Sequence, residues 1–393
     1  MRLAFVTPWY GPDIPGGAET EMRRTAEHLR QAGLEVEVLT TCIRDFYADW
    51  SHNHHPSGPA VINGVLVRRF PVGPRDKAHF DAINAKLLQG LSINAAEERV
   101  FVGEMMRADG LYDYIERHCR DYLFFFMPYM FSTTYFGVQI CPERSYLIPC
   151  LHDEAYARLN TYRSAFAGLR GWLFLSAPEM TLAQRLYDLD SAHLALVGGG
   201  VDTAFTTDAD AFRRKYALEG PFLLFAGRRD AGKNVELLID YFRRYRRERP
   251  ERTSLWLVFI GPGRMPVRLA EGENISDLGF VPVQDKYDAY AAAAVLCQPS
   301  LKESFSIVLM ESWVAGRPAL VHADCAVTKD HCKRSNGGLY FANYDEFALC
   351  LDLLLHRPRL AARMGENGRA YVLENFGWDI IEGKYRRLLE DVS

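Results

Sequence analysis

The sequence predicts an α/β protein built from two units, each with a mainly parallel sheet and crossover helices. Strand, glycine-rich loop, helix and strand follow one another between Leu3 and Phe70, which is the order of a parallel sheet with helical crossovers. The same order starts again at Phe222–Ala226. Gly198-Gly199-Gly200 stands before this second start as a natural flexible joint. A chain of 393 residues is also too long for one ordinary core.

The first unit is predicted to run over residues 1–198. Helical spacing of apolar side chains predicts a helix over Ala18–Ala32, which Gly33 ends, and a longer helical stretch over roughly Ala78–Arg120. The strands are expected at apolar or β-branched runs, which are Leu3–Thr7, Glu35–Thr40, Val65–Phe70, Tyr122–Met127, Ser145–Leu151, Trp172–Ser176 and His193–Val197.

One uncharged segment of this unit, from Tyr122 to Ile140, approaches the length of a membrane span. Pro128 interrupts it, and polar residues dilute its second half. We therefore expect a buried strand at Tyr122–Met127, a loop at Pro128 and a partly buried helix. A membrane span is the weaker alternative.

The second unit is predicted over residues 199–375, with a C-terminal helix over 376–393. Helices are expected at Val235–Arg247 and from about Ser306 to Ala315, and Phe376–Glu390 has an amphipathic pattern. The strands are expected at Phe222–Ala226, Ser254–Gly261, Ile275–Leu278, Ala294–Gln298 and, as the last strand, Arg317–His322.

Composition narrows the class of protein. With 48% apolar and 24% charged residues the chain resembles an ordinary soluble enzyme, and we expect it to be cytoplasmic. A net charge of −4 provides no general attraction to nucleic acid. The eight cysteines lack a C-x-x-C pair and are interpreted as reduced core residues, not as disulfides or a zinc site. A basic stretch over Arg243–Arg252 favours a solvated helix face, with peripheral membrane contact as the alternative.

Two glutamates, Glu303 and Glu311, are the first candidate functional residues. A helix starting near Ser306 would offer unpaired N–H groups to an anion, with Glu303 just before it and Glu311 two turns along. A carboxylate can accept hydrogen bonds from two neighbouring sugar hydroxyls. The eight-residue spacing of the two glutamates alone is also compatible with an ordinary solvated helix. The surrounding motifs therefore decide between a solvated helix and a binding site.

Three loops that follow predicted strands supply the other candidates. Arg228 and Lys233 would bring fixed positive charge to the end of a strand, where it could stabilise a diphosphate leaving group. Gly16 and Gly17 would let backbone amides approach a ligand. This loop is not the dinucleotide fingerprint G-x-G-x-x-G, which argues against a nicotinamide enzyme. His152 directly follows a predicted strand and is expected to point into a crevice.

Taken in order, these motifs resemble retaining glycosyltransferases of the GT-B fold, family 4 in particular, over nearly the whole chain. The matching elements are Gly16-Gly17-Ala18-Glu19, Gly200-Val201-Asp202, Arg228 with Lys233, Ile260-Gly261-Pro262-Gly263, Leu278-Gly279-Phe280-Val281-Pro282, and the E-x7-E pair Glu303 and Glu311. The resemblance implies two Rossmann-like domains facing each other across a cleft, with the C-terminal helix crossing back to the N-terminal domain.

The resemblance also implies roles. Arg228 and Lys233 would hold the donor diphosphate, Glu311 the ribose and Glu303 the transferred sugar, with His152 near donor sugar and acceptor. Further donor contacts would come from Gly16, Gly17, Gly261, Phe280, Val281, Phe305, Ser306 and Ile307. No metal or other cofactor is expected, because the family needs none and no D-x-D motif stands among these residues.

Three departures from the family pattern concern the donor. Ser304 and Ser306 replace the glycines of E-G-F-G, and Asn234 replaces the glycine after the lysine. The expected function is therefore transfer of a hexose from a UDP- or GDP-linked donor to a glycan or lipid-linked saccharide, by an enzyme of unknown oligomeric state. The alternatives are a catalytically silent sugar- or partner-binding module of a glycan-assembly complex, and a sugar-nucleotide epimerase, which the missing dinucleotide fingerprint disfavours.

Overall fold

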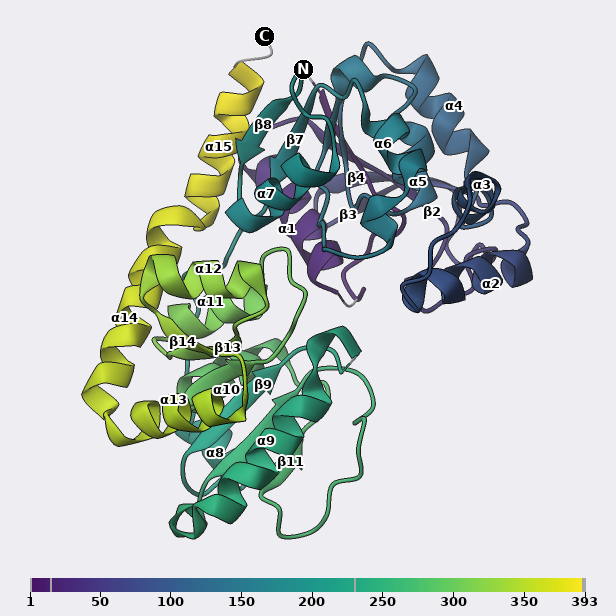
Figure 1. Cartoon of the computed structure of the whole chain (residues 1–393). Coiled ribbons are helices and arrows are strands. Elements are labelled where there is room, and N and C mark those ends of the chain that lie inside the picture. The colour runs from purple at the N-terminus through teal and green to yellow at the C-terminus, as the bar shows by residue number, and fades with distance from the viewer. Residues whose placement is uncertain (1, 15, 230, 391–393) are drawn as a thin grey trace. The chain divides into compact units, whose positions relative to one another are not determined.

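The computed structural model describes residues 2–14, 16–229 and 231–390 (Figure 1). Contacts between Cα atoms divide the chain into two compact units. The first unit comprises residues 1–200 and 382–393, and the second comprises residues 201–381. Each unit is an α/β layer structure around its own mainly parallel sheet.

The first unit contains an eight-stranded sheet in the order β3-β4-β2-β1-β5-β6-β7-β8. All neighbouring strands are parallel except β3 and β4. The strands are β1 (Arg2–Val6), β2 (Val36–Thr41), β3 (Gly58–Ile62), β4 (Val65–Phe70), β5 (Tyr122–Phe126), β6 (Ser145–Leu147), β7 (Gly171–Phe174) and β8 (His193–Leu196). Strand β3 was not predicted; Asn63 and Gly64, both with positive φ, form the two-residue turn that pairs it with β4.

The helices of the first unit correct one prediction. They are α1 (Gly17–Gln31), α2 (Lys77–Leu88), α3 (Ala95–Gly103), α4 (Asp109–Arg117), α5 (Ser132–Gly137), α6 (Asn160–Phe166) and α7 (Ala177–Leu186), with 3-10 turns at Pro142–Arg144 and Tyr156–Arg158. The single helical stretch predicted over Ala78–Arg120 is wrong, because three helices occupy it. Gly90 adopts a left-handed backbone after α2, and Asn94 with Glu97 forms a capping box that starts α3.

Both faces of the first sheet are covered, and the larger core cluster of the unit lies on the face of Ala4 and Phe124. Phe5 and Phe125 lie on one face, and the ring of Tyr385 from α15 (Trp378–Glu390) packs at 6.3 and 6.0 Å from theirs. The ammonium of Lys384 on the same helix donates to the carbonyl of Val197 at 2.7 Å. The C-terminal helix therefore contributes to the core of the first unit.

The uncharged segment folds as predicted, into the buried strand β5 and the short helix α5. Among the residues that the structure describes, no helix combines the length and apolarity that crossing a bilayer requires.

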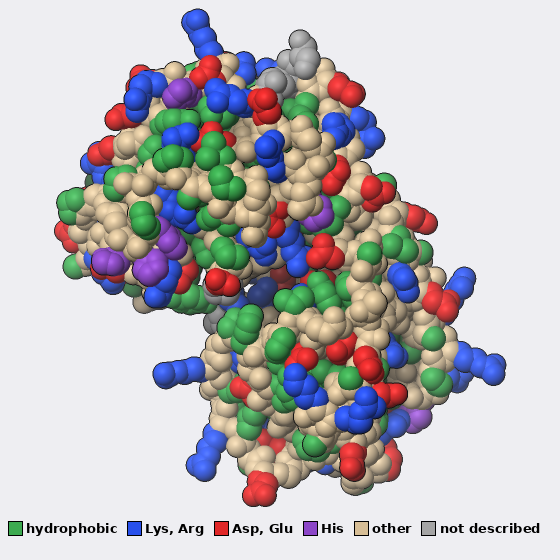
Figure 2. All heavy atoms as spheres, turned by 180° about the vertical axis from the view of Figure 1, so that it is seen from behind, with side chains coloured by type: hydrophobic (Ala, Val, Ile, Leu, Met, Phe, Trp, Pro, Cys, Tyr) green, Lys and Arg blue, Asp and Glu red, His purple; other side chains and the backbone are tan. Residues whose placement is uncertain are grey.

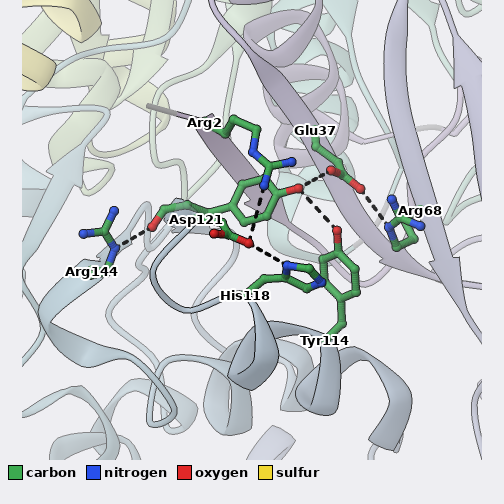
Figure 3. A network of polar contacts seen from close by, with 8 residues as sticks. Arg2, Glu37, Arg68, Tyr114, His118, Asp121 and Arg144 are labelled. Atoms are coloured by element: carbon green, nitrogen blue, oxygen red, sulfur yellow. Dashed lines mark hydrogen bonds and ion pairs between the residues drawn. The ribbon is translucent and has the colours of Figure 1, made fainter.

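A polar network crosses the strands of the first sheet near their amino-terminal ends (Figure 3). The buried Glu37 of β2 accepts hydrogen bonds from Arg68 of β4 at 2.8 Å and from the hydroxyl of Tyr122 at 2.6 Å. The Tyr122 hydroxyl also lies 3.3 Å from that of Tyr114 on α4, and Arg2 stacks over the Tyr122 ring. Because parallel α/β sheets bind ligands at their carboxyl ends, we interpret this network as structural.

The second unit contains a six-stranded sheet, parallel throughout, in the order β11-β10-β9-β12-β13-β14. The strands are β9 (Phe222–Ala226), β10 (Trp256–Ile260), β11 (Ile275–Asp277), β12 (Val295–Gln298), β13 (Ala319–His322) and β14 (Gly338–Phe341). The prediction that Arg317–His322 is the last strand is wrong, since β14 follows it. Strand β14 is short and begins with glycine, so its sequence carries little strand signal.

Helices cover both faces of this sheet (Figure 1). They are α8 (Ala209–Lys215), α9 (Val235–Glu248), α10 (Val283–Ala292), α11 (Ile307–Val314), α12 (Ala326–Ser335), α13 (Tyr344–His356) and α14 (Pro358–Asn375), with 3-10 turns at Ala231–Lys233 and Pro250–Arg252. One face carries the core of α9 and α13, and Phe212 of α8 packs on Phe222 at the other.

The cysteine prediction is partly wrong. Cys119 and Cys141 form a disulfide, because the segments before β5 and β6 bring their Cα atoms to 6.0 Å. Five of the other cysteines are buried core residues and Cys350 is half-buried, as the sequence suggested.

The basic stretch Arg243–Arg252 is largely paired within the second unit, for example Arg243 with Glu273 at 2.9 Å and Arg249 with Asp352 at 2.7 Å. On the face shown in Figure 2, acidic and basic side chains are interspersed. These pairs favour the solvated helix face over a membrane-docking surface.

Candidate active site

Three loops at the carboxyl ends of β9, β10 and β11 are tied to one another. The amide of Gly227 donates to the carbonyl of Ile260 at 3.0 Å, and the amide of Gly261 donates to that of Gly279 at 2.7 Å. A Cβ atom on Gly261 would stand 2.3 Å from the Gly227 carbonyl oxygen, and its φ is +117°. Gly261 is therefore required for this close approach of two loops.

Arg229 is the residue that fastens these loops together. Its guanidinium is fully buried and donates to the Gly261 carbonyl and to the carboxylate of Asp277. The sequence had predicted Arg228 and Lys233 as the cations of the loop after β9, and it had given Arg229 no individual role. Arg229 therefore has a structural role. Arg228 is half-buried and remains the candidate arginine for binding a ligand in this loop. Asp230 of the same loop lies outside the described residues.

Two residues that replace family glycines adopt the left-handed backbone that glycine favours. Ser306, just before α11, has φ 73°, and Asn234, just before α9, has φ 55°. Asparagine tolerates this region, whereas serine loses about 1 kcal/mol relative to glycine. The Ser306 hydroxyl is buried, and no hydrogen-bond partner lies near it among the described residues.

Glu303 and Lys233 are in direct contact. The ammonium of Lys233 lies 2.6 Å from one carboxylate oxygen of Glu303, and the amide of Gln298 donates to the same oxygen at 3.2 Å. Burial alone would raise the pKa of Glu303, but the charge of Lys233 and the hydrogen bonds hold this pKa below its usual value. Glu303 is thus an ionised acceptor next to a fixed cation.

Glu311 is held separately, on the first turns of α11. It is 1% exposed, and its two carboxylate oxygens accept from Lys286 at 2.6 Å and from the Tyr290 hydroxyl at 2.9 Å. Neither partner was predicted from the sequence, and both lie on α10. The sequence signal that could have indicated them is their four-residue spacing, which puts both on one helix face shortly after Phe280-Val281.

Among the remaining candidates of the second unit, Phe280 is exposed, whereas Val281 and Phe305 are buried. Phe280 is 78% exposed directly after β11, where a planar ring could stack on it, whereas Val281 is buried beside it. Phe305 is buried and packs on the rings of His331 and Phe376 at 5.6 and 5.0 Å. Its side chain anchors the loop, so only its backbone amide and that of the half-buried Ile307 remain as ligand groups.

The first-unit candidates occupy loops after β1 and β6. Gly16 has φ 145°, and a Cβ atom there would collide with the carboxylate of Glu19, which accepts a hydrogen bond from Trp9 at 3.1 Å. Gly17 opens α1. Pro15 of this loop lies outside the described residues. The sequence had explained the glycines by ligand approach, but the positive φ of Gly16 already favours glycine at this position.

His152 lies near the carboxylate of Glu154 in the first unit. Its Nδ1 atom is 3.9 Å from Glu154, which accepts a hydrogen bond from the buried Tyr129 hydroxyl at 3.0 Å. The backbone before His152 is fixed as well, since the amide of Leu151 donates to the buried Glu179 at 2.7 Å. The histidine ring is about a third exposed, so it is accessible to a ligand.

Comparison with known proteins identifies the family. The family model described as "Glycosyl transferases group 1" matches residues 208–371. The D-inositol 3-phosphate glycosyltransferase of Streptomyces scabiei is 31% identical over 410 residues, covering 96% of this chain and 87% of that protein. The chain belongs to the glycosyl transferases group 1 family. It is accordingly an enzyme, a glycosyltransferase.

Solved structures show the fold of this glycosyltransferase. Sucrose-phosphate synthase from Thermosynechococcus elongatus aligns over 100% of both chains with a TM-score of 0.75 at 18% identity. The Anabaena protein HepE, in complex with UDP-glucose, aligns over 100% of both chains with a TM-score of 0.68 at 15% identity. The fold predicted from the sequence, two Rossmann-like domains of GT-B type, is confirmed. The matched range 208–371 includes Arg228, Lys233, Glu303 and Glu311.

Proposed function

We propose that this glycosyltransferase moves a hexose from a UDP- or GDP-linked donor to a glycan or lipid-linked saccharide, as a retaining enzyme of family 4 type. The observation that carries the proposal is the contact of Lys233 with Glu303 at the carboxyl end of the second sheet. This contact supports the proposal because a carboxylate can accept sugar hydroxyls and the ammonium beside it is suited to a diphosphate. HepE, which has the same fold, was solved with UDP-glucose, which supports a nucleotide-sugar donor.

The donor-side chemistry follows from the charges of the second unit. As the glycosidic bond breaks, negative charge grows on the diphosphate, and Lys233 and Arg228 stabilise it. The amides that open α11, with those of Phe305 and Ser306, add the positive end of the helix dipole. Glu303 accepts hydroxyls of the transferred sugar, and Glu311 accepts those of the ribose.

Retention is proposed to arise by front-face attack, in which the departing phosphate takes the proton of the acceptor hydroxyl. No carboxylate then forms a covalent bond to the sugar. His152 is proposed to hydrogen-bond the transferred sugar or the acceptor hydroxyl. The first unit is proposed to bind the acceptor and the second the nucleotide sugar.

We also propose that no metal takes part. Lys233 and Arg228 can supply the charge that a divalent ion would bring, and both Glu303 and Glu311 already have a lysine partner. If the acceptor is lipid-linked, we propose that the protein also contacts the membrane surface peripherally.

A donor screen in the presence of EDTA tests this proposal. The purified protein is incubated with UDP- and GDP-hexoses and a set of saccharide acceptors, and nucleotide release and the anomeric configuration of the sugar transferred to the acceptor are measured. We expect release from one donor class, an α-linked product from an α-linked donor, and loss of turnover in Glu303→Gln. Inversion would refute the mechanism, and dependence on added metal would refute metal independence. Inactivity with every donor would favour the sugar-binding module instead.

A further inference from the structure

We propose that Lys286 and Tyr290 are positioning residues that fix Glu311 as an acceptor for two neighbouring hydroxyls, so that Lys286 sets the affinity for the nucleoside part of the donor. This inference rests on the proposed function, because it concerns the same nucleotide-sugar site. It assigns roles to two side chains of α10 that lie outside the motifs of the sequence.

The geometry shows how the two side chains act on one carboxylate. Lys286 and Tyr290 stand four residues apart on α10, and therefore on the same face of this helix. Helix α10 packs against α11, which carries Glu311. The ammonium reaches one carboxylate oxygen at 2.6 Å and the phenol reaches the other at 2.9 Å. Each oxygen therefore has one fixed donor, and the carboxylate plane cannot rotate without breaking both contacts.

Counting lone pairs indicates what Glu311 can still bind. An ionised carboxylate offers about four acceptor positions. Lys286 and Tyr290 take one on each oxygen, which leaves about one on each. Two acceptor positions on adjacent oxygens match the two vicinal hydroxyls of a ribose and do not match a single hydroxyl. The arrangement therefore predicts preference for ribonucleotide over 2′-deoxyribonucleotide donors.

The exposed fractions of the side chains place Lys286 on the accessible side of this group. The side chain of Lys286 is 26% exposed and that of Glu311 is 2% exposed, while Tyr290 is fully buried. A buried carboxylate without its cation is strongly disfavoured, so without Lys286 the Glu311 carboxylate would turn toward another hydrogen-bond donor. It would then no longer present one acceptor position on each oxygen to the ribose.

The experiment compares nucleotide binding and turnover in Lys286→Met, Lys286→Arg and Tyr290→Phe. Titration calorimetry with UDP and GDP, and with their 2′-deoxy forms, gives the ratio of ribose to deoxyribose affinity. Lys215→Met is the matched control, since the Lys215 ammonium bonds Asp285 of the same helix at 2.6 Å and does not contact Glu311. Circular dichroism and the melting temperature show whether each variant folds.

For Lys286→Met we expect about tenfold weaker binding of the nucleoside diphosphate and a similar rise in donor KM, with kcat within about twofold. The preference for the ribonucleotide should shrink, Lys286→Arg should restore part of the affinity, and Lys215→Met should match the wild type. A folded Lys286→Met variant with wild-type affinity and deoxyribose discrimination would overturn the inference while the proposed function stands. Failure of the wild-type protein to bind either diphosphate would overturn the proposed function, and this inference with it.

Discussion

The contact between Lys233 and Glu303 permits a quantitative test of the site, made by replacing Lys233 with methionine. The two charged atoms are 2.6 Å apart, and the side chains are 19% and 10% exposed. Removing one partner of a fully buried pair costs about 3–5 kcal/mol, and an exposed pair contributes about 0–1 kcal/mol. Because this pair is mostly buried and Gln298 still donates to Glu303, we expect a loss of about 2 kcal/mol at neutral pH.

The pH dependence of this loss has a definite sign. In the wild type, the pKa of Glu303 lies below its unfolded value, so its stabilising contribution is present above the unfolded pKa and is lost as the pH falls. Without Lys233, burial dominates and raises the pKa of Glu303 above the unfolded value. The ionised group is then destabilising at neutral pH, and this penalty falls as protonation sets in. The difference in stability between the variant and the wild type should therefore be largest at neutral pH and should shrink steadily as the pH falls toward and below the unfolded pKa of glutamate.

Calorimetry is the appropriate assay, because a chain with two cores need not unfold in a single transition. For a unit of this size, 2 kcal/mol corresponds to a fall of about 4–8 °C in the melting temperature. The variants Glu303→Gln and Lys233→Met/Glu303→Gln complete a double-mutant cycle. The double variant should recover part of the loss, since it has no unpaired buried charge. An equal loss at pH 7.5 and pH 5, or no recovery in the double variant, would refute this reasoning.

Two further predictions concern stability, and a third concerns metal. Ser306→Gly should stabilise the second unit by about 1 kcal/mol, because glycine accepts the left-handed backbone and removes a buried hydroxyl. Ser306→Ala should stabilise it less, because alanine removes the hydroxyl but not the backbone strain. Calorimetry measures the two melting temperatures. Glu37→Ala should lower the stability of the first unit by about 2 kcal/mol, because Arg68 and the Tyr122 hydroxyl lose their acceptor. An unchanged melting temperature would show that the network of Figure 3 contributes nothing to stability. Initial rates of transfer should be unchanged by EDTA and by added Mg²⁺ or Mn²⁺.

The parts of the fold that sequence predicted are those with strong local signals. Strand β9 was predicted at its observed bounds, because a continuous apolar run between turn residues is typical of a strand buried on both faces. The helices between β4 and β5 were merged, since apolar spacing continues through the capping residues that separate them. The Cys119–Cys141 pair depends on how two connections run in space, and spacing along the chain contains no such information.

The candidate site shows the same limit in chemical terms. The order of motifs along the chain singled out Glu303 and Glu311 and implied a different sugar for each, but it indicated no partner side chain for either carboxylate. The structure gives each its own lysine from a different element: Lys233 comes from the loop after β9, and Lys286 comes from α10. A diphosphate that reaches Lys233 must compete with Glu303 for the same ammonium, whereas a ribose that reaches Glu311 finds its lysine already in use as a support. Loss of Lys233 should therefore slow transfer, and loss of Lys286 should weaken nucleotide binding, although both changes remove the cation beside a glutamate of the same motif.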